Sequence, residues 1–320
     1  DEDVPAYNRG MFWHTAHDVS AETSNHRTYP LSGAGGGGGP SCEHLYASGL
    51  ALHYWLTGER SSRDCVLELG QFVIDADDGR LTPLKWISQK PTGLASRSGA
   101  PDYHGPGRGS GNALRTLLDA YSVSEDEKFL IKAGELVRRC VHPDDDPDTH
   151  RLREPEIRWF YMVFLRSLCG YLLVKHEHSQ FDDDFHYARD SLLRYVRWMC
   201  KHEYFYLDKP DRLLEPTETW AAQEFRKSEV LDLASLFADS SERATFHDKA
   251  AYFFERAESA LSRSETRTFA RPIALALTFG AMRSAFCGKH APALDAPYGT
   301  PINVGRRRQF VPQRADALRR

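Results

Sequence analysis

The sequence predicts an all-α protein, an (α/α) toroid of helical hairpins, from three observations. Apolar residues recur at helical spacing in one segment after another between residues 41 and 287, with polar breaks between paired segments. No segment shows the strict alternation of a half-buried strand. The first two pairs also align, since LALHYWLTGERSSRDCVLELGQFV and TLLDAYSVSEDEKFLIKAGELVRRC share their apolar positions and a central polar break. Such self-similarity indicates repeated hairpins.

The helices are expected in order along the chain. The first begins at Ser41, a suitable N-cap after Pro40, and ends at Thr57-Gly58. Its partner covers about 61–74, and the second hairpin covers about 111–123 and 127–140. The third covers 155–175 and 182–202, and the fourth 218–237 and 242–262. A last helix, 272–286, starts with Pro272, which suits a first helical turn.

Long and unequal repeats favour a closed ring of hairpins over a regular solenoid. About nine helices are expected, whereas a complete ring of six hairpins needs about twelve. The ring is therefore incomplete or is finished by residues outside this chain. We expect an irregular segment that lines the pocket at 1–40, the toroid domain at 41–287, and an extended or disordered basic tail at 288–320.

Composition excludes several classes of protein. The chain has 320 residues and a formal charge of −4, so nothing indicates a general nucleic-acid binder or a membrane-surface protein. No apolar run approaches the roughly 20 residues of a membrane helix. No signal-peptide pattern is visible, and because the chain begins with Asp1 we expect a fragment or a processed form.

The six cysteines are scattered and form no C-x-x-C pair, which argues against a zinc finger or a disulfide framework. Cys65, Cys140, Cys169 and Cys200 lie within helix-like apolar patterns, where small core residues are expected. Unpaired cysteines favour a reducing compartment, so the cytoplasm is slightly preferred as the location.

Residues 11–49 have the most unusual composition of the chain. They gather histidine, tyrosine and charged residues around five consecutive glycines, Gly35 to Gly39. Ordering five glycines costs backbone entropy and contributes no packing, so a close approach of backbone to a ligand would explain them. A flexible surface loop is the simpler explanation.

In a toroid, the loops that lead into the inner helices meet at one mouth. We call these loops the helix-start clusters, and they hold most of the candidate site residues. As catalytic residues we predict Glu43, His44, Tyr103, His104 and Glu218. As substrate-binding residues we predict His14, His17, Asp18, His26, Arg27, Arg108, Arg158, Trp220 and Arg271. Helix N-termini favour anions, and the arginines add positive charge, so the mouth suits a carboxylate, sulfate or phosphate.

Each cluster also has a structural explanation. His14-x-x-His17-Asp18 could bind a metal with His26 or His44, but local hydrogen bonding is the favoured explanation, so we predict no metal and no cofactor. Tyr103-His104 could supply a catalytic base, with Arg108 binding an anion beside it. Alternatively, these residues belong to a loop held by its own hydrogen bonds.

The acidic residues also have a catalytic and a structural explanation. Glu218 and Glu224 are six residues apart and share a helix face poorly, so Glu224 is better explained by a pair with Arg226, Lys227 or a neighbouring helix. The aspartates at 144–146 and 182–184 are typical of solvated turns and helix starts.

The helical part resembles the toroid domains of carbohydrate-active enzymes. The phrases GGGGGPSCEHLYASGLALHYWLTGE, SGAPDYHGPGRGSGNALRTLLDAY and TETWAAQEFRKSEVL are similar to those of large bacterial proteins in which a toroid follows β-rich domains, as in the exo-type rhamnogalacturonan lyase-like family. The resemblance covers about 41–287 and concerns pattern and loop placement. It implies an acidic carbohydrate substrate and β-rich domains upstream in the full-length protein.

Three functions remain open at this point. Lyase-type β-elimination is favoured, with His104 or His44 as base, Tyr103 or Tyr46 as acid, and Arg108 with Arg271 neutralising the uronate. A glycoside hydrolase would need two carboxyl groups, from Asp18, Glu43, Asp102, Glu218 or Glu224. A non-catalytic carbohydrate-binding or scaffold domain would need neither the base and acid of a lyase nor the carboxyl pair of a hydrolase.

Overall fold

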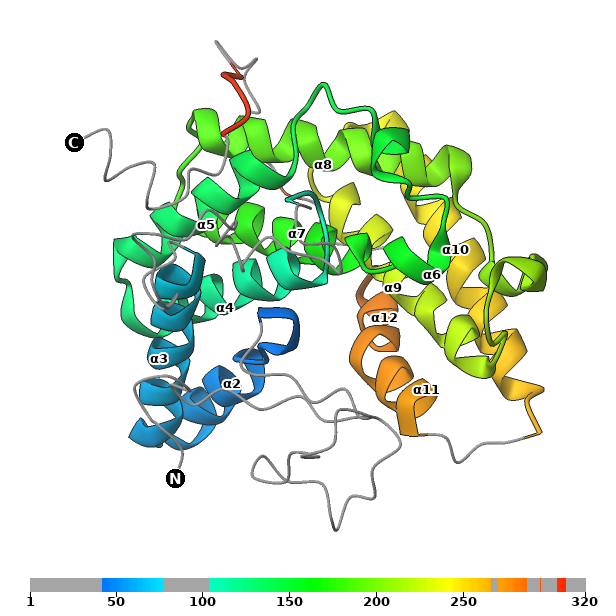
Figure 1. Ribbon diagram of the computed structural model, residues 1–320, viewed down its shortest axis with the longest axis horizontal. Helices are drawn as coiled ribbons and strands as arrows, with labels where there is room; N and C mark the ends of the chain where they lie inside the picture. The colour runs from blue at the N-terminus through cyan, green and yellow to red at the C-terminus, as the bar shows by residue number, and fades with distance from the viewer. Residues whose placement is uncertain (1–41, 78–103, 266–269, 287–293, 295–303, 309–320) are drawn as a thin grey trace, which may run out of the picture. The chain divides into compact units, whose positions relative to one another are not determined.

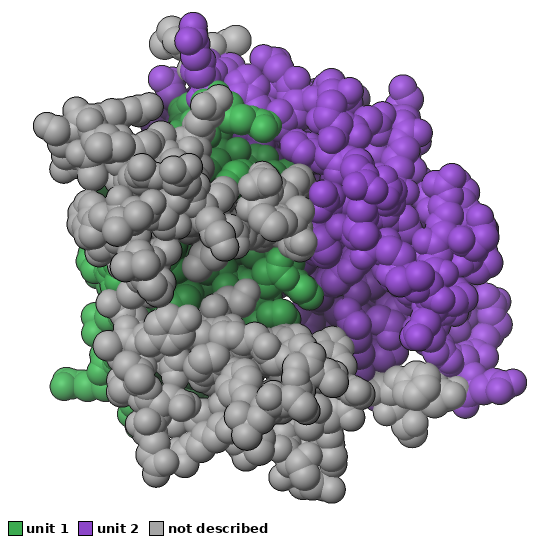
Figure 2. All heavy atoms as spheres, in the orientation of Figure 1, with its two compact units in different colours: residues 1–140, 307–320 green, residues 141–306 purple. Residues whose placement is uncertain are grey.

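A computed structural model describes residues 42–77, 104–265, 270–286, 294 and 304–308, and within these ranges the regular secondary structure is entirely helical (Figure 1). This confirms the all-α prediction, while the toroid remains a prediction. The chain divides into two compact units, which are coloured separately in Figure 2. Unit 1 comprises residues 1–140 and 307–320, and unit 2 comprises residues 141–306.

Unit 1 is built from two helical hairpins and a short turn. Its described elements are η1 (Cys42–His44), α2 (Ser48–Thr57), α3 (Arg60–Asp77), α4 (Arg108–Ser124) and α5 (Glu127–Cys140). Gly58 ends α2 in the left-handed conformation (φ 73°), where glycine carries no steric cost. The first two hairpins of the sequence analysis are thus present in unit 1.

The first helix begins later than the sequence pattern predicts. Cys42–His44 form a 3₁₀ turn and the α-helix starts at Ser48, while the predicted N-cap, Ser41, lies outside the described residues. Leu45 and Ala47 are buried in the short connection between turn and helix. Apolar residues in this buried irregular segment give the same sequence pattern as a first helical turn. Periodicity alone therefore could not place the start of the helix.

Helix α3 packs closely on the second hairpin at Gly70. A Cβ atom at this position would lie 2.7 Å from the Cβ of Ala120 and 2.9 Å from the ring of Phe129. Any larger residue would push α3 away from α4 and α5, so the contact between the hairpins requires glycine here.

Unit 2 contains the remaining helices. Its longer elements are α7 (Tyr161–Glu177), α8 (Asp183–His202), α9 (Glu218–Ser235) and α10 (Ser240–Ser262). Its short elements are η3 (Pro147–His150), α6 (Pro155–Arg158), η4 (Tyr206–Asp208), η5 (Pro210–Arg212), α11 (Ala270–Leu275), the π-helical turn η6 (Ala276–Gly280) and α12 (Met282–Phe286). The helix predicted at 155–175, the first of the third hairpin, is divided at Trp159-Phe160, and the predicted last helix is divided by the π-helical turn.

Helix α9 forms the centre of unit 2 and contacts α7, α8, α10, α11, η4, η6 and α12. Most of it is buried, although it has no continuous apolar face. Half of its buried side chains are polar or charged: Gln223, Glu224, Lys227, Ser228, Glu229, Asp232 and Ser235. Buried charged groups need partners inside the protein, and neighbouring segments supply them for Glu224, Lys227, Glu229 and Asp232.

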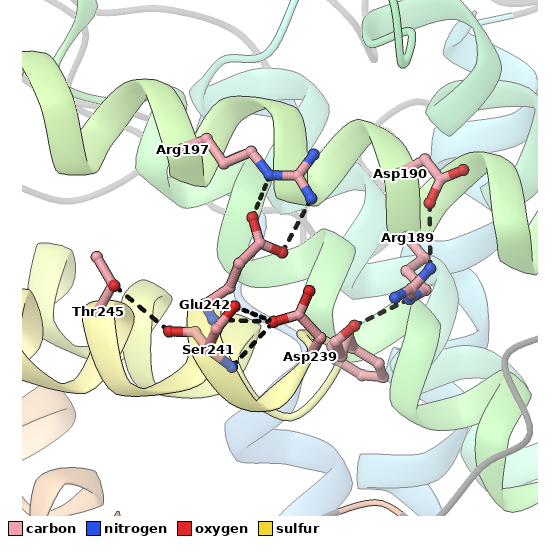
Figure 3. Close-up of polar contacts among 8 residues, drawn as sticks. Arg189, Asp190, Arg197, Asp239, Ser241, Glu242 and Thr245 are labelled. Atoms are coloured by element: carbon pink, nitrogen blue, oxygen red, sulfur yellow. Dashed lines mark hydrogen bonds and ion pairs between the residues drawn. The ribbon is translucent and has the colours of Figure 1, made fainter.

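The start of α10 is fixed to α8 by charged side chains (Figure 3). Asp239 caps α10, accepting from the backbone N–H groups of Ser241 at 3.0 Å and Glu242 at 2.9 Å. Arg197 of α8 forms a two-bond contact with the Glu242 carboxylate, with Nη2 donating to Oε2 at 2.9 Å. Arg189 donates from Nε to the carbonyl of Phe237 at 2.9 Å.

The predicted acidic helix starts are confirmed in unit 2. Asp182 caps α8 and accepts from the N–H of Phe185 at 2.9 Å, and Asp146 accepts from Asp148 N–H at 3.1 Å at the start of η3. Among the described helices, none is long and apolar enough to span a membrane.

Candidate functional site

In unit 1, the structure brings together the first two helix-start clusters. Arg108, the first residue of α4, donates from Nη2 to Oε2 of Glu43 in η1 at 2.6 Å and from Nε to the same oxygen at 3.2 Å. The two side chains are 32% and 20% exposed. The ion pair is therefore at the surface of unit 1, within reach of a ligand.

A second bond fixes η1 on the start of α4. Asn112, one turn after Arg108, donates its side-chain amide to the carbonyl of Glu43 at 2.8 Å. The chain before α4 is buried from Gly105 to Gly107, and Ser110 accepts from the N–H of Gly107 at 3.0 Å. The backbone around the Glu43–Arg108 pair is thus held by hydrogen bonds from both sides, which preorganises the two charges.

The two predicted histidines flank this pair along the chain. His44 follows Glu43 in η1, is half-buried, and meets Tyr46 edge to face with ring centres 6.4 Å apart. His104 is half-buried and lies four residues before Arg108. We call Glu43, His44, His104 and Arg108 the η1–α4 site. These residues combine a guanidinium, a carboxylate, two imidazoles and the N-terminus of a 17-residue helix.

The predicted site residues of unit 2 make structural contacts. Arg158 donates from Nε to the carbonyl of His150 at 3.1 Å, and Glu218 accepts from the Ser264 hydroxyl at 2.9 Å. Trp220 donates from Nε1 to the carbonyl of Glu215 at 3.0 Å and meets the ring of Tyr206 edge to face. Arg271 is exposed in α11.

Several predicted residues lie outside the described part of the chain. They include the glycine run and the histidine-rich stretch that precedes it: His14, His17, Asp18, His26, Arg27, Gly35 to Gly39, and Tyr103.

The cysteines differ in part from the predicted core positions. Cys140 and Cys169 are buried, whereas Cys65 and Cys200 are only half-buried. Among the described residues, no cluster of three or more His, Cys, Asp or Glu side chains could hold a metal ion.

Sequence reasoning missed a buried ionic network on α9. The Lys227 ammonium lies 2.9 Å from Oε2 of Glu203 and 3.0 Å from Oε2 of Glu224, and all three side chains are almost fully buried. Glu203 also accepts from the hydroxyl of Tyr161 at 2.8 Å. The pairing of Glu224 with Lys227 confirms the simpler explanation of Glu224 and does not support a catalytic pair with Glu218.

The network also holds the segment after α8. Glu224 accepts from the N–H of Tyr206 at 2.9 Å, and Lys227 donates to the carbonyl of Tyr204 at 2.6 Å. Burial raises the pKa of Glu224 to about 7, although Lys227 opposes the shift. Two carboxyl groups and one ammonium share this buried site, so a proton on Glu224 would balance their charge.

A second missed group lies further along α9. Asp232 is fully buried, and its Oδ1 lies 3.0 Å from Nδ1 of His247 in α10 and 2.6 Å from Nη1 of Arg283 in α12. Burial raises the pKa of Asp232, while His247 and Arg283 oppose the shift. These contacts fasten α12 and α10 to α9, so we assign them a structural role.

A shallow depression of about 310 Å³ in unit 2 includes none of the predicted site residues. Arg153 and Glu154 in its wall are paired with Asp148 and Arg151, respectively. Its remaining lining residues are Pro155, Glu156, Ile157 and Arg212.

Comparisons with known proteins do not place the chain in a family. No family model matches it, and neither a curated protein nor a solved structure is significantly similar. Function must therefore be argued from the site itself.

Proposed function

We propose that the chain is the helical domain of an enzyme that acts on an acidic poly- or oligosaccharide by β-elimination. The proposal rests on one observation, the half-exposed Arg108 held by Glu43 at the N-terminus of α4. Arginine matches a carboxylate in shape and charge, and the free N–H groups of a helix start add a further preference for anions.

The residues of the η1–α4 site can supply the steps of an elimination. His104 or His44 takes the proton from C5 of the uronate, and the C5–H electron pair forms the C4=C5 double bond. The bond between C4 and the glycosidic oxygen breaks, and that oxygen receives a proton from an acid. Tyr46, exposed and in ring contact with His44, is a candidate acid in the described part of the chain.

Arg108 stabilises the charge that develops on the uronate carboxylate when C5 loses its proton. Glu43 fixes the direction of the guanidinium, which lowers the cost of ordering it in the transition state. The histidines suit this chemistry near neutral pH, because an unperturbed imidazole has a pKa of about 6.5.

The resemblance to rhamnogalacturonan lyase-like proteins supports the same proposal and adds β-rich domains upstream as partners in a longer protein. Hydrolysis is less well supported by the described residues. It needs two carboxyl groups at the substrate, and among the candidates Glu43 is engaged with Arg108 and Glu224 is buried with Lys227.

The test is incubation with polygalacturonate and with rhamnogalacturonan fragments, followed by ultraviolet absorbance and a reducing-end assay. Elimination yields a conjugated unsaturated uronate that absorbs in the ultraviolet, and hydrolysis yields reducing ends without that absorbance. We expect Arg108→Gln and the double variant His44→Gln/His104→Gln to lose at least about tenfold in kcat/KM.

Matched controls are available in unit 1. Arg115 lies in the same helix and pairs with Asp119 at 2.9 Å, and His53 contacts Ser62 at 2.9 Å. Arg115→Gln and His53→Gln should leave turnover unchanged. Reducing ends alone would indicate a hydrolase. Binding without either product would indicate a carbohydrate-binding or scaffold domain.

A further inference from the structure

The depression of about 310 Å³ belongs to unit 2, whereas the η1–α4 site belongs to unit 1. Its wall comes from two separate segments of the chain, residues 153–157 around α6 and Arg212 at the end of η5. A hydrogen bond joins these segments, since the N–H of Leu214 donates to Oε1 of Glu156 at 2.6 Å. Small-molecule sites begin at roughly 300 Å³, so the depression suits a small ligand.

Two of the four charged side chains in the wall are satisfied by ion pairs. Arg153 donates to both carboxylate oxygens of Asp148, at 2.8 and 2.9 Å. Glu154 accepts from Nε and Nη2 of Arg151 at 2.7 and 2.6 Å. Each of these contacts is a two-bond pair, which fixes the side chain and balances its charge within the wall.

The other two charged side chains, Glu156 and Arg212, form no ion pair with any residue that the structure describes. Glu156 accepts only from the neutral N–H of Leu214. Arg212 lies near the hydroxyl of Tyr204: burial raises the pKa of that hydroxyl, and Arg212 opposes the shift. A phenol is uncharged at neutral pH, so it does not neutralise the guanidinium. One carboxylate and one guanidinium therefore line the same depression without pairing.

Exposed apolar side chains accompany these two charges. Ile157 in the wall is 38% exposed, and Leu214, whose N–H contacts Glu156, is 87% exposed. Covering apolar surface with another apolar group is favourable. The ligand that matches the depression thus combines an ammonium group, a carboxylate and an apolar part.

We propose that this depression binds a short zwitterionic peptide of about two residues, with its ammonium on Glu156 and its carboxylate on Arg212. The guanidinium of Arg212 can donate two parallel N–H groups to the peptide carboxylate. Apolar side chains of the peptide cover Ile157. An acidic sugar has no ammonium group and would satisfy Arg212 alone, so the observations favour a peptide. The inference does not depend on the proposed function, because it concerns another unit and another class of ligand.

The experiment is a titration of the isotope-labelled full chain with leucyl-leucine, followed by NMR. We expect the amide signals of Ile157 and Leu214 to shift and to saturate, since Ile157 lines the depression and the Leu214 amide contacts Glu156. N-acetyl-leucyl-leucine lacks the ammonium group, and leucyl-leucinamide lacks the carboxylate. Each should bind at least about threefold more weakly, the loss of one charged contact at a partly exposed surface.

Two variants assign the ends of the peptide. Glu156→Gln keeps an oxygen acceptor for the Leu214 N–H but removes the charge, so it should weaken leucyl-leucine binding at least about threefold. It should leave the affinity for N-acetyl-leucyl-leucine unchanged, because that ligand has no ammonium group. Arg212→Gln should weaken leucyl-leucine binding to a similar extent and leave the affinity for leucyl-leucinamide unchanged.

Matched controls are Glu255→Gln and Arg263→Gln, which remove the same charges at exposed positions of unit 2 outside the depression. Both should bind leucyl-leucine like the unmodified chain. Circular dichroism verifies that each variant folds. The two blocked peptides test the inference on the unmodified chain even where a variant does not fold.

Three results would overturn the inference: no binding of leucyl-leucine, equal affinities for the free and the blocked peptides, or signal shifts that leave Ile157 and Leu214 unchanged. Its failure is separable from that of the proposed function. Unsaturated product without peptide binding supports the enzyme and rejects the peptide site. Peptide binding without unsaturated product supports the site and rejects elimination.

Discussion

Unit 1 and unit 2 each bury a cluster of three charged side chains, and these two clusters have opposite charge balance. In unit 1, one carboxylate serves two cations: Asp77 lies 2.8 Å from Lys132 Nζ and 2.8 Å from Arg139 Nη2. In unit 2, one cation serves two carboxylates, since Lys227 lies between Glu203 and Glu224. All of these side chains are less than 9% exposed.

The difference shows that burial alone does not determine the charge of an acid. Burial raises the pKa of both carboxyl groups, but Arg139 and Lys132 outweigh it at Asp77, so the pKa of Asp77 ends below its ordinary value. At Glu224 a single ammonium, shared with Glu203, does not outweigh burial, and the pKa rises to about 7. At Asp77 two close cations outweigh burial, whereas at Glu224 one shared cation does not.

The largest effect is expected from Lys227→Met, which removes the single cation of the unit 2 cluster. Two buried carboxyl groups are then left without a positive partner, and the free energy of unfolding should fall by about 3–5 kcal/mol. Urea unfolding followed by circular dichroism measures this loss. As a control, Arg197→Met breaks the exposed pair with Glu242 and should cost no more than about 1 kcal/mol. Equal losses in both variants would contradict the expectation.

A somewhat smaller loss is expected from Asp77→Asn in unit 1. Two buried cations lose their shared anion, but Lys132 retains Glu135 at 3.4 Å, so we expect about 2–4 kcal/mol. Because the pKa of Asp77 is lowered in the folded state, its contribution is present above the ordinary value of 3.8 and is lost as pH falls through the folded value. As pH falls, the free energy of unfolding of the variant should therefore decrease by less than that of the unmodified chain. Equal decreases in the two proteins would refute this.

The smallest change in stability is expected from Glu224→Gln below pH 4.5. Glutamine resembles the protonated carboxyl group, so at that pH the free energy of unfolding should change by less than about 1 kcal/mol. This variant also separates the two clusters most sharply. In the unmodified chain the folded pKa is raised from 4.5 to about 7, so stability is full below 4.5 and decreases as pH rises towards 7.

The variant should lack that decrease, which amounts to on the order of 3 kcal/mol for a shift of this size. Thermal unfolding between pH 4 and pH 8 records both profiles. A variant whose stability falls with pH as steeply as that of the unmodified chain would show that Glu224 carries no shifted proton.

The helices of both units were largely predictable because apolar residues recur within segments that are separated by polar breaks, and α3, α4, α5 and α8 are clearly amphipathic. The failures have local causes. Apolar residues continue through Trp159-Phe160, so periodicity could not reveal that α6 ends there and α7 starts at Tyr161. The sequence likewise gives no sign of the π-helical turn at Ala276–Gly280, because a wider helical turn can be built from the same residue types as an α-helix.

Helix starts were the places where the sequence suggested candidate site residues. Glu43 and Arg108 lie 65 positions apart in the chain and meet in an ion pair, while their roles at a substrate stay predictions. Lys227 was a candidate partner of Glu224 because the two are three positions apart on one helix. Glu203 could not be found this way, since it reaches Tyr161 and Lys227 only through the packing of α7 and α9.

The enclosure of α9 has a consequence for how unit 2 opens. Helices at a protein surface can fray individually, but α9 is contacted by its neighbours on every side, and its charged groups hold the backbone of Tyr204 and Tyr206. Its amide protons should exchange with deuterated solvent only when the whole unit opens. In hydrogen-exchange terms, α9 then reports the global stability of unit 2, whereas α2, with Ala51 as its single buried residue, reports local opening.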